Sequence, residues 1–328
     1  MTNTAGSTLY ELHVDAYPAG ALSVISFDGH EEMNGLYSWE VVVWGTDIDE
    51  VELEERVLGR PVALSMHLAA GASRHVRGIV SRLDLEGHRE AGRKPFRLTI
   101  VPKAWRLGKR VNSRIFQDKT VRQITDIILD EHGITRDWSL LARYPVRQFC
   151  VQHQEDDLRF ITRILADEGI FFSFEQPALD AGKGEAERLV FGDNAPSYRA
   201  ISGDAALRYR PQQGDGAMHV EEDQILDFRE RAEVGSDSVV LRDYDFRRTL
   251  PDLTSSATAP GAEDGPPLQV YDHDRERERT ATDDAGVYLE QLRAGLRVGH
   301  GVSACRRLLP GHRFDLHGHD VEKLNAPW

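Results

Sequence analysis

Two stretches of the chain share one plan, in which a short helix ends at a glycine and leads directly into an apolar strand. The first runs from Arg114 to Ile134 and the second from Tyr144 to Glu175. Both are rich in residues that cap and pack helices and poor in residues that catalyse reactions. The shared plan predicts an α+β region in the middle of the chain and favours a structural or assembly role.

The first helix has clear start and stop signals. Thr120 and Gln123 have the spacing of a capping box, and Gly133 stands where a left-handed C-terminal cap is expected. Between them, apolar residues recur on one helical face, at Val121, Ile124, Ile127 and Ile128. Asp126, Asp130 and Glu131 lie around the same helix and are interpreted as solvated.

The second helix repeats this plan. Its buried face is predicted at Leu158, Ile161, Ile164 and Leu165, and Gly169 ends it. Glu155, Asp156 and Asp157 stand at its start, where the helix dipole favours negative charge. An alternative would make them acid/base catalysts, but their position already supplies a structural reason. The segment 170–174 then reads as a strongly apolar strand.

The first hundred residues read as strands and turns. Short segments rich in β-branched and aromatic residues follow one another, at 10–14, 22–27, 37–44, 61–68, 72–86 and 94–102. Asn34-Gly35 is the predicted corner between two of them, Gly71-Ala72 and 87–94 are predicted hairpin connections, and 51–58 is a predicted short helix. Closely spaced strands with glycine turns predict an antiparallel barrel or sandwich.

The last third mixes strands with less regular segments. Residues 178–187 are interpreted as a polar turn. The segment 251–267 is rich in Pro, Ser, Ala and Gly and is predicted to be a mobile loop. Residues 274–299 are interpreted as mostly helical, and final strands are expected around 300–308 and 312–319.

Composition limits the partners of the chain. The formal net charge is −14 and the isoelectric point is near 5.4, so nucleic-acid binding, which needs a basic surface, is disfavoured. A local basic patch stays open as a minor alternative, with Arg114, Arg143, Arg147, Arg159 and Arg163 as candidates. No apolar run approaches the roughly 18 residues of a membrane span, and the N-terminus lacks the pattern of a cleaved signal peptide.

No motif of catalysis or cofactor binding stands out. Cys150 could form a thiol nucleophile with His153, but a spacing of three on a strand puts them on opposite faces, so a buried free thiol is preferred. His312, His317 and His319 could bind a metal if His317 and His319 shared a strand face, although an ordinary polar face is favoured. We therefore predict no catalytic residue, metal or cofactor.

Four blocks of sequence, in order, resemble one known family. They are LSVISFDGHEEMNGLYSWEVVVW, RIFQDKTVRQITDIIL, YPVRQFCVQHQEDDLRFITRILADEGIFFSFE and GVSACRRLLPGHRFDLHGH. Together they are similar to the valine-glycine repeat protein G (VgrG) family, the spike proteins of type VI secretion systems. The resemblance extends from about Leu9 to about Asn325, and it rests on the order and spacing of the blocks.

The resemblance implies a fold that is mainly β with α+β insertions, and two related antiparallel β-barrel hub domains similar to those of the contractile-phage tail hub. It implies a homotrimer that docks on a tube of Hcp hexamers, contacts baseplate components, and carries a needle, an effector or adaptor, and a PAAR-type tip protein. It also implies a cytoplasmic protein that is exported without a cleaved signal peptide. The chain ends where the family's neck barrel would begin, which leaves open a fragment or a hub-only version.

On this basis the predicted domains are a first barrel at 1–104, an α+β domain at 105–215, and a second barrel at 216–328 with an insertion at about 247–298. The predicted subunit contacts are Tyr37, Trp39, Trp44, Arg313, Phe314, His317 and His319, and the loop at 251–267 is a possible chaperone or adaptor contact. The leading hypothesis is a structural, non-enzymatic hub of a type VI spike. Alternatives are the hub of a phage tail or an extracellular contractile injection system, and, less favoured, a β-scaffold glycan hydrolase.

Overall fold

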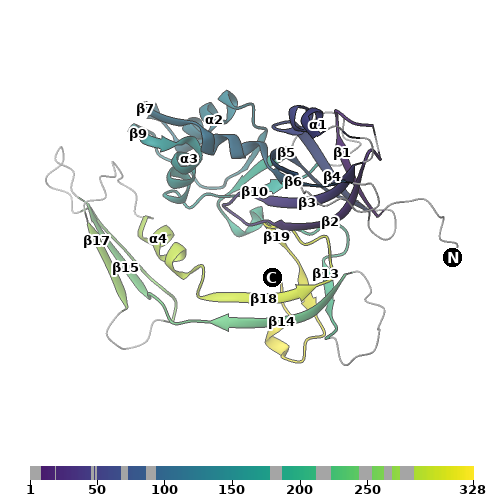
Figure 1. Ribbon diagram of the computed structural model, residues 1–328. Helices are drawn as coiled ribbons and strands as arrows, with labels where there is room; N and C mark the ends of the chain where they lie inside the picture. The colour runs from purple at the N-terminus through teal and green to yellow at the C-terminus, as the bar shows by residue number, and fades with distance from the viewer. Residues whose placement is uncertain are drawn as a thin grey trace.

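Strands dominate the architecture in the computed structural model of the chain (Figure 1). The structure describes residues 9–18, 20–45, 48, 50–67, 73–85, 94–177, 187–211, 223–243, 253–261, 268–273 and 284–328. The predicted connections at 71–72, 87–93 and 178–186 lie outside these residues. The prediction of a mainly β fold with α+β insertions is confirmed.

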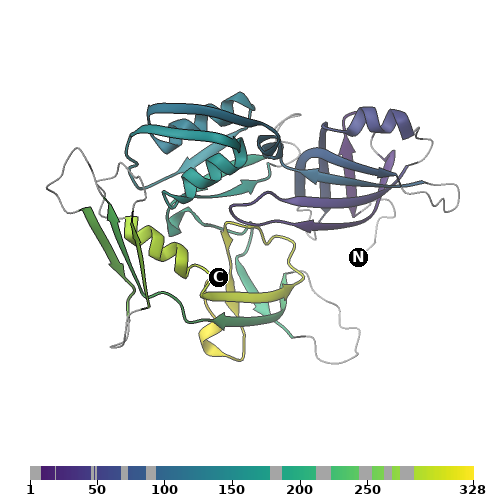
Figure 2. The same ribbon diagram turned by 60° about the vertical axis from the view of Figure 1, so that its left-hand side comes forward.

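The N-terminal third forms one curled antiparallel sheet, with α1 at one end (Figure 2). Its strand order is β1-β4-β5-β6-β3-β2, with β1 at Tyr10–Val14, β2 at Leu22–His30, β3 at Ser38–Gly45, β4 at Pro61–His67, β5 at Ser73–Leu85 and β6 at Lys94–Val101. The curl brings the edge strands β1 and β2 together, and the rings of Tyr10 and Phe27 meet edge-on at 5.0 Å. The helix predicted at 51–58 is present as α1, Glu50–Val57.

The middle region contains a two-stranded ribbon, two helices and a three-stranded sheet. The ribbon pairs β7 (Val111–Lys119) with β9 (Arg147–Asp156), and the sheet has the order β10-β11-β8, with β10 at Phe171–Glu175, β11 at Arg188–Gly192 and β8 at Arg136–Ser139. The helices are α2 (Val121–Glu131) and α3 (Asp157–Ala166), and a 3-10 helix, η2 (Lys103–Lys109), precedes the ribbon. One face of the ribbon packs on the helices, with the rings of Phe116 and Phe160 stacked at 5.6 Å.

The helix signals read from the sequence are confirmed. Thr120 and Gln123 form both bonds of the capping box, and Gly133 and Gly169 adopt positive φ angles of 60° and 69° just after their helices. One correction is needed, because Arg114 lies in strand β7 and not in a helix. Each stretch is therefore strand–helix–strand, since the alternating exposure of 114–119 belongs to a ribbon.

A second sheet, of order β18-β14-β13-β20, contains the C-terminal strands. Its strands are β13 (Ala206–Tyr209), β14 (Gln224–Ala232), β18 (Arg297–Ser303) and β20 (Asp315–His317). Here β13 runs parallel to both β14 and β20, so this sheet is mixed, whereas a wholly antiparallel barrel was expected. Two further short strands pair beside it, β12 (Arg199–Ala200) and β19 (His312–Arg313), and η3 (Ala195–Ser197) and η4 (Glu322–Leu324) are 3-10 turns.

A small three-stranded sheet covered by one helix projects from the second sheet (Figures 1 and 2). It comprises β15 (Ser238–Asp243), β16 (Leu253–Thr258), β17 (Gln269–His273) and α4 (Asp284–Arg293). Two predictions are corrected here. The segment 251–267 contains strand β16, which pairs with β15. In the described part of the helix expected over 274–299, residues 284–293 are helical, and the end of the segment is not, because Arg297–Ser303 pairs with β14. Residues 274–283 and 262–267 lie outside the described residues.

Gly78 in β5 provides a test of how tightly the first sheet is packed. A Cβ atom there would lie 2.2 Å from the carbonyl oxygen of Val101, a backbone atom that cannot turn away. We expect Gly78→Ala to lower the free energy of unfolding by about 2 kcal/mol through overpacking. Chemical denaturation measured by circular dichroism would show it.

The matched control is Gly286→Ala in α4, where a Cβ would meet nothing within 4 Å. Alanine there should leave stability unchanged or raise it by up to about 1 kcal/mol, because alanine favours a helix. Equal effects of the two substitutions would contradict the packing at Gly78.

Candidate functional site: a buried ion network and the contacts between the sheets

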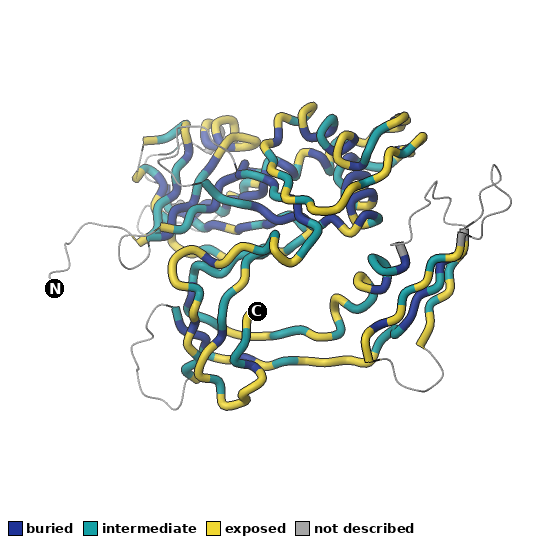
Figure 3. Tube along the Cα trace, turned by 180° about the vertical axis from the view of Figure 1, so that it is seen from behind, coloured by how far each residue is buried: buried dark blue, intermediate teal, exposed yellow. Residues whose placement is uncertain are grey.

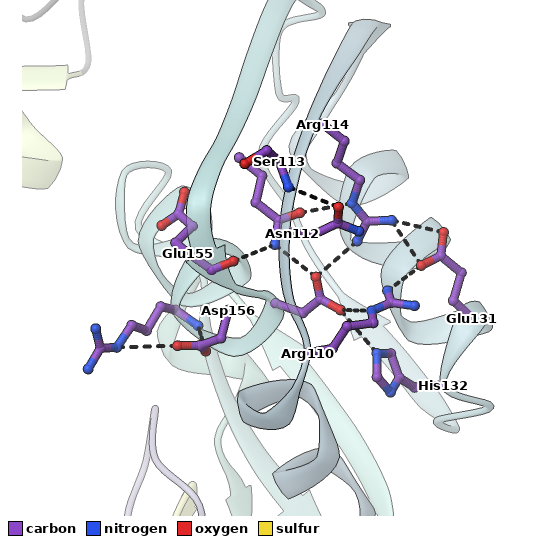
Figure 4. A network of polar contacts seen from close by, with 11 residues as sticks. Arg110, Asn112, Ser113, Arg114, Glu131, His132, Glu155 and Asp156 are labelled. Carbon is purple, nitrogen blue, oxygen red and sulfur yellow. Dashed lines mark hydrogen bonds and ion pairs between the residues drawn. The ribbon is translucent and has the colours of Figure 1, made fainter.

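The carboxylate of Asp157, at the first turn of α3, is buried. Figure 4 labels residues around it, among them Arg110, Arg114 and His132. The Asp157 side chain is fully buried. It accepts hydrogen bonds from Arg110 Nε at 2.6 Å, Arg114 Nη2 at 3.0 Å and Gln152 Nε2 at 2.8 Å, and His132 Nε2 lies 3.0 Å away. These donors come from the end of η2, from both ribbon strands and from the end of α2.

The network continues to Glu131, which bridges the two arginines. Arg114 Nη1 lies 2.9 and 3.0 Å from the two Glu131 oxygens, and Arg110 Nη2 also donates to Glu131. Burial alone would raise the pKa of Asp157, but the hydrogen bonds from Gln152, His132 and Arg110 outweigh burial and hold that pKa below its usual value. Asp157 therefore stays charged inside the fold.

The neighbouring carboxylates also have structural partners. Asp156 caps α3 by accepting the backbone N–H of Arg159 at 2.9 Å, and Glu155 pairs with Arg163 at 2.5 Å. The cluster at 155–157 is thus brought together at a helix start, as the sequence indicated. Because each of these three carboxylates already holds a structural contact, the cluster fixes the start of α3 and offers no open acid/base pair.

The carboxylates on α2 and most of the candidate arginines have ionic partners. Arg136 contacts Asp126 at 2.6 Å and Asp130 at 2.5 Å, which joins α2 to β8. Arg147 contacts Glu168 at 2.7 Å. Asp130 and Glu131 are exposed, as interpreted, although both are also paired, whereas Asp126 is only partly exposed. Of the five candidate arginines, Arg114, Arg147, Arg159 and Arg163 each pair with a carboxylate.

The histidine and cysteine candidates are also placed by their contacts. Strand β20 ends at His317, and Gly318 turns the chain with φ of 77°, so His317 and His319 do not share a strand face. His319 Nδ1 accepts the N–H of Val321 at 3.0 Å, and its Nε2 lies 3.1 Å from the Phe228 carbonyl. Within the described ranges, no cluster of three or more His, Cys, Asp or Glu is placed to hold a metal ion.

Cys150 lies buried on the inner face of the ribbon, as expected for a strand thiol, and His153 is exposed. Burial raises the pKa of Cys150, an effect only partly offset by the nearby positive charge of Arg147. A thiol with a raised pKa is a poor nucleophile at neutral pH.

No helix among the described residues has the length and apolar character to cross a membrane.

Backbone and side-chain bonds join the first sheet to the rest of the chain. Asn34, with φ of 60°, confirms the predicted corner between β2 and β3. Its N–H donates to the Phe172 carbonyl at 2.9 Å, and its side-chain oxygen accepts the Phe172 N–H at 2.8 Å. The corner is thereby hydrogen-bonded to β10, a contact that the turn signal alone did not reveal.

A second junction connects the first sheet to the C-terminal region. Arg74 donates to Glu31 Oε2 at 2.5 Å and to the Arg306 carbonyl at 3.0 Å, and its guanidinium lies 5.3 Å from the centroid of the Trp39 ring. Trp39 Nε1 in turn donates to Glu31 at 3.1 Å. Sequence reasoning missed Arg74, because a single arginine in a strand gives no signal of a partner 232 residues away.

A buried acid lies where the first sheet meets the α+β region. Glu187 accepts the backbone N–H of Lys103, and burial raises its pKa to about 7, with the charge of Lys103 and of Arg77 opposing this rise. Tyr37 is buried as well, and its burial, together with the charge of Glu187, raises the pKa of Tyr37 well above its usual value. Tyr37 donates its hydroxyl hydrogen bond to the Arg77 carbonyl.

The predicted contact residues fall into two groups. Tyr37 and Trp39 are buried within the chain, with 2% and 7% of their surface exposed, so their side chains offer little to another subunit. Trp44, Phe314 and His319 are partly exposed, and Arg313 and His317 are exposed. For these five residues a role in subunit contact stays a prediction.

Asp157→Asn should lower the free energy of unfolding by about 2 kcal/mol, because it removes a buried charge from between two arginines that retain Glu131 and access to water. Since its pKa is lowered, the stability that Asp157 contributes is present above pH of about 4 and is lost as the pH falls through the folded pKa. Denaturant titrations from pH 3 to 7 should show that the difference in unfolding free energy between the wild type and the variant becomes smaller as the pH falls.

The control is Asp137→Asn, whose exposed pair with Arg188 should contribute less than about 1 kcal/mol. A gap between wild type and Asp157→Asn that stayed constant down to the acid transition would contradict a charged Asp157.

The contribution of Glu187 to stability should depend on pH in the opposite way from that of Asp157, because its pKa is raised and not lowered. With a folded pKa of about 7, its neutral form is favoured in the fold. Its contribution is fully present below the ordinary pKa of about 4.3 and is lost as the pH rises through 7. In Glu187→Gln the fall in stability between pH 5 and pH 8 should be smaller than in wild type, whereas Glu322→Gln on the exposed surface should behave as wild type does.

The chain matches the model of one protein family over most of its length. The family is the phage tail baseplate hub (GPD), and the match covers residues 30–328. Among curated relatives, the type VI secretion system spike protein VgrG4b of Pseudomonas aeruginosa is 33% identical over 345 aligned positions, which cover 100% of this chain and 39% of that protein. The actin cross-linking toxin VgrG1 of Vibrio cholerae is 30% identical, with 97% of this chain and 29% of the toxin covered.

Solved structures show the same fold. A component of the type VI secretion system of E. coli, described as similar to the T4 bacteriophage tail proteins gp27 and gp5, aligns with a TM-score of 0.67 at 19% identity, covering 94% of this chain and 68% of that one. A 43 kDa tail protein of prophage MuSo2 from Shewanella oneidensis aligns with a TM-score of 0.60 at 13% identity, covering 97% and 91%. The chain spans less than half of the curated spike proteins, and it belongs to the phage tail baseplate hub (GPD) family.

Proposed function

We propose that this chain is the structural hub of a type VI secretion spike. The observation that carries the proposal is the alignment of the whole chain with a spike protein at 33% identity, combined with a family model for baseplate hubs. The hub would assemble as a homotrimer, dock on the ring of an Hcp hexamer, contact baseplate components, and carry a needle with its effector, adaptor or PAAR-type tip protein. Its action is mechanical and non-enzymatic.

The contacts between the sheets support this role. A hub that passes thrust must keep its parts in fixed positions, and here the first sheet is tied to β10 at Asn34 and to the C-terminal region at Arg74. Glu155, Asp156 and Asp157, the carboxylates that the sequence offered as possible catalysts, instead hold the ribbon and α3 in place.

We also propose how the chain is divided and where it acts. The proposed domains are 1–104, 105–215 and 216–328, although β13 (Ala206–Tyr209) pairs with β14 and β20 and so shares the sheet of the third. Trp44, Arg313, Phe314, His317 and His319 would lie on the surface between subunits. The protein would act from the cytoplasm and leave the cell with the firing tube, without a cleaved signal peptide. Obligate interfaces of this kind bury more than about 2,000 Å².

The second candidate is the hub of a phage tail. It is favoured by the fold shared with a prophage tail protein, at a TM-score of 0.60, and by the name of the family. The two candidates predict the same assembly, and the neighbouring genes distinguish them, because a tape-measure gene would favour a phage tail.

The trimer can be tested directly. Light scattering of the purified protein should give three times the 36.9 kDa mass of the chain, and the trimer should co-sediment with purified Hcp hexamers. Trp44→Ser should lower the trimer mass toward that of one chain, because the partly exposed ring would lose its apolar contact with the next subunit.

The control is Leu141→Ser, which changes an exposed apolar side chain away from the predicted contact surface and should leave the mass unaltered. A monomer at every concentration, with native circular dichroism and no association with Hcp, would contradict the hub assignment for this chain.

A further inference from the structure

Buried apolar residues form separate cores on the two sides of a seam in the chain. The first sheet and the α+β region, which we together call the N-terminal lobe, share one apolar cluster that extends from Leu12 to Phe191. The second sheet has its own smaller cluster, from Ile201 to Leu324, and among the described residues neither cluster includes a side chain from the other part. Figure 3 shows the buried stretches gathered in the N-terminal lobe, with fewer in the second sheet. Each core therefore stabilises its own part and leaves the angle between the parts to other contacts.

The described chain crosses this seam once, at residues 192–200. Near the crossing, Arg199 pairs with Glu175, but the side chain of Arg199 is 59% exposed, and an exposed pair contributes little. Through the small projecting sheet, Val287 of α4 also lies against Gly169. Neither contact reaches the first sheet, so the position of the second sheet against the first depends on a third contact.

That third contact is a polar clasp around Arg74, on strand β5. Its Nη2 donates to Glu31 Oε2 at 2.5 Å, and its Nη1 donates to the carbonyl of Arg306, in the segment that follows β18, at 3.0 Å. The guanidinium of Arg306 lies in turn over the ring of Tyr10 on β1, 5.5 Å from its centroid. An arginine is a planar fork whose donors point in fixed directions, so the Arg74 side chain fixes the Arg306 segment relative to the first sheet.

Apolar packing beside this clasp is incomplete. A small pocket, which Glu31 of the clasp lines, is also lined by Tyr37 and Phe174 of the N-terminal lobe. Leu309 and Pro310, which follow the clasped carbonyl in the chain, line the same pocket. Side chains that line a pocket lack neighbours on one side and lose those contacts. The polar bonds of the clasp, and not interlocked apolar side chains, therefore determine how the segment lies on the first sheet.

The clasp is costly to keep, which favours a role in position over a role in stability. The side chains of Arg74 and Glu31 are only 15% and 14% exposed, and an ion pair that is nearly buried loses much of its attraction to the cost of leaving water. The Nε–H of Arg74 is buried as well, without a hydrogen-bond partner among the described residues, which adds a further cost. Buried ionic groups that add little stability can still select one arrangement of a fold.

We propose that Arg74 is a positioning residue, which sets the angle between the N-terminal lobe and the second sheet by holding Glu31 and the Arg306 carbonyl together. Without this side chain the two parts would keep their own cores and pivot about the crossing at residues 192–200.

The angle bears on assembly. A ring of identical subunits closes only if each contact repeats the rotation that closure requires. Since the proposed subunit surface includes Trp44 of the first sheet and Arg313 beside the second, a changed angle would open the ring. This step rests on the proposed hub function, whereas the positioning by Arg74 does not.

The angle can be measured as a distance between two spin labels by pulsed electron paramagnetic resonance. Labels are attached at Val111→Cys in the N-terminal lobe and Val302→Cys in the second sheet, positions whose side chains are 66% and 58% exposed. The native cysteines are buried, and labelled protein is mixed with excess unlabelled protein, so that each assembly holds one labelled chain. We expect one narrow distance distribution with Arg74 present, and a broadened and shifted one for Arg74→Gln, because glutamine has neither the charge nor the length to hold both acceptors.

Two further variants make the result specific. Glu31→Gln keeps an oxygen that accepts from Arg74 but loses the charge, and it should give a smaller shift in the same direction. Arg97→Gln removes an exposed pair with Glu40 on the same sheet and should leave the distribution unchanged. Far-UV circular dichroism should be the same for all variants, since each core is intact. A distribution that stayed unmoved in both Arg74→Gln and Glu31→Gln, or that moved equally in Arg97→Gln, would overturn the proposal.

Light scattering separates the proposal from the hub assignment. We expect Arg74→Gln to lose mass relative to the wild-type trimer, whereas Arg97→Gln keeps the trimer mass. A monomeric wild type, with the distance shift still present in Arg74→Gln, would contradict the hub assignment and support the positioning role. A full trimer of Arg74→Gln at a shifted distance would overturn the step from angle to ring.

Discussion

The geometry of the α+β region depends on one buried negative charge. Asp157 begins α3, and its carboxylate receives donors from Arg110, Arg114 and Gln152, with His132 beside it. A lone buried carboxylate would be too costly to keep ionised, but one surrounded by several donors is retained in its charged form. Because the donors come from four different segments, the ion fixes how the ribbon lies on both helices.

This constraint extends to the rest of the molecule through backbone bonds. The strand that follows α3, β10, accepts and donates to Asn34 at the corner of the first sheet. The C-terminal region connects back through the carbonyl of Arg306, which receives Arg74. The small projecting sheet is also anchored, because α4 places Val287 against Gly169, where a Cβ would lie 2.9 Å from Val287 Cγ1. Gly169 thus ends α3 and leaves room for α4.

The parts of the fold that could be predicted were those set by local chemistry. The capping box at Thr120, the glycines after both helices and the corner at Asn34 depend on residues within a few positions of one another, and all of them are observed. Buried helix faces follow from a period that any short window contains. Residues 155–157 were placed correctly at a helix start for the same reason.

What the sequence did not reveal depends on pairing between distant segments. Composition predicted a loop over 251–267, yet Leu253–Thr258 is held as a strand by β15. The helix expected to reach 299 stops early. Gly299 lies in β18, where a Cβ would come within 2.7 Å of Phe228 and 2.9 Å of Trp328, so only glycine lets that strand lie against these rings. Arg110 and Arg114, which bind Asp157, lie 47 and 43 residues away from it in the sequence, beyond the reach of any local pattern.

The same network explains how a two-stranded ribbon keeps its shape. A two-stranded ribbon alone is marginally stable in water. Here Arg114 and Gln152, on the two ribbon strands, both bind Asp157 beneath the sheet. The inner ion network therefore holds Ile115 and Val151 in fixed register on the outer face. The buried charge of Asp157 thus gives the ribbon a rigidity that two strands alone would lack.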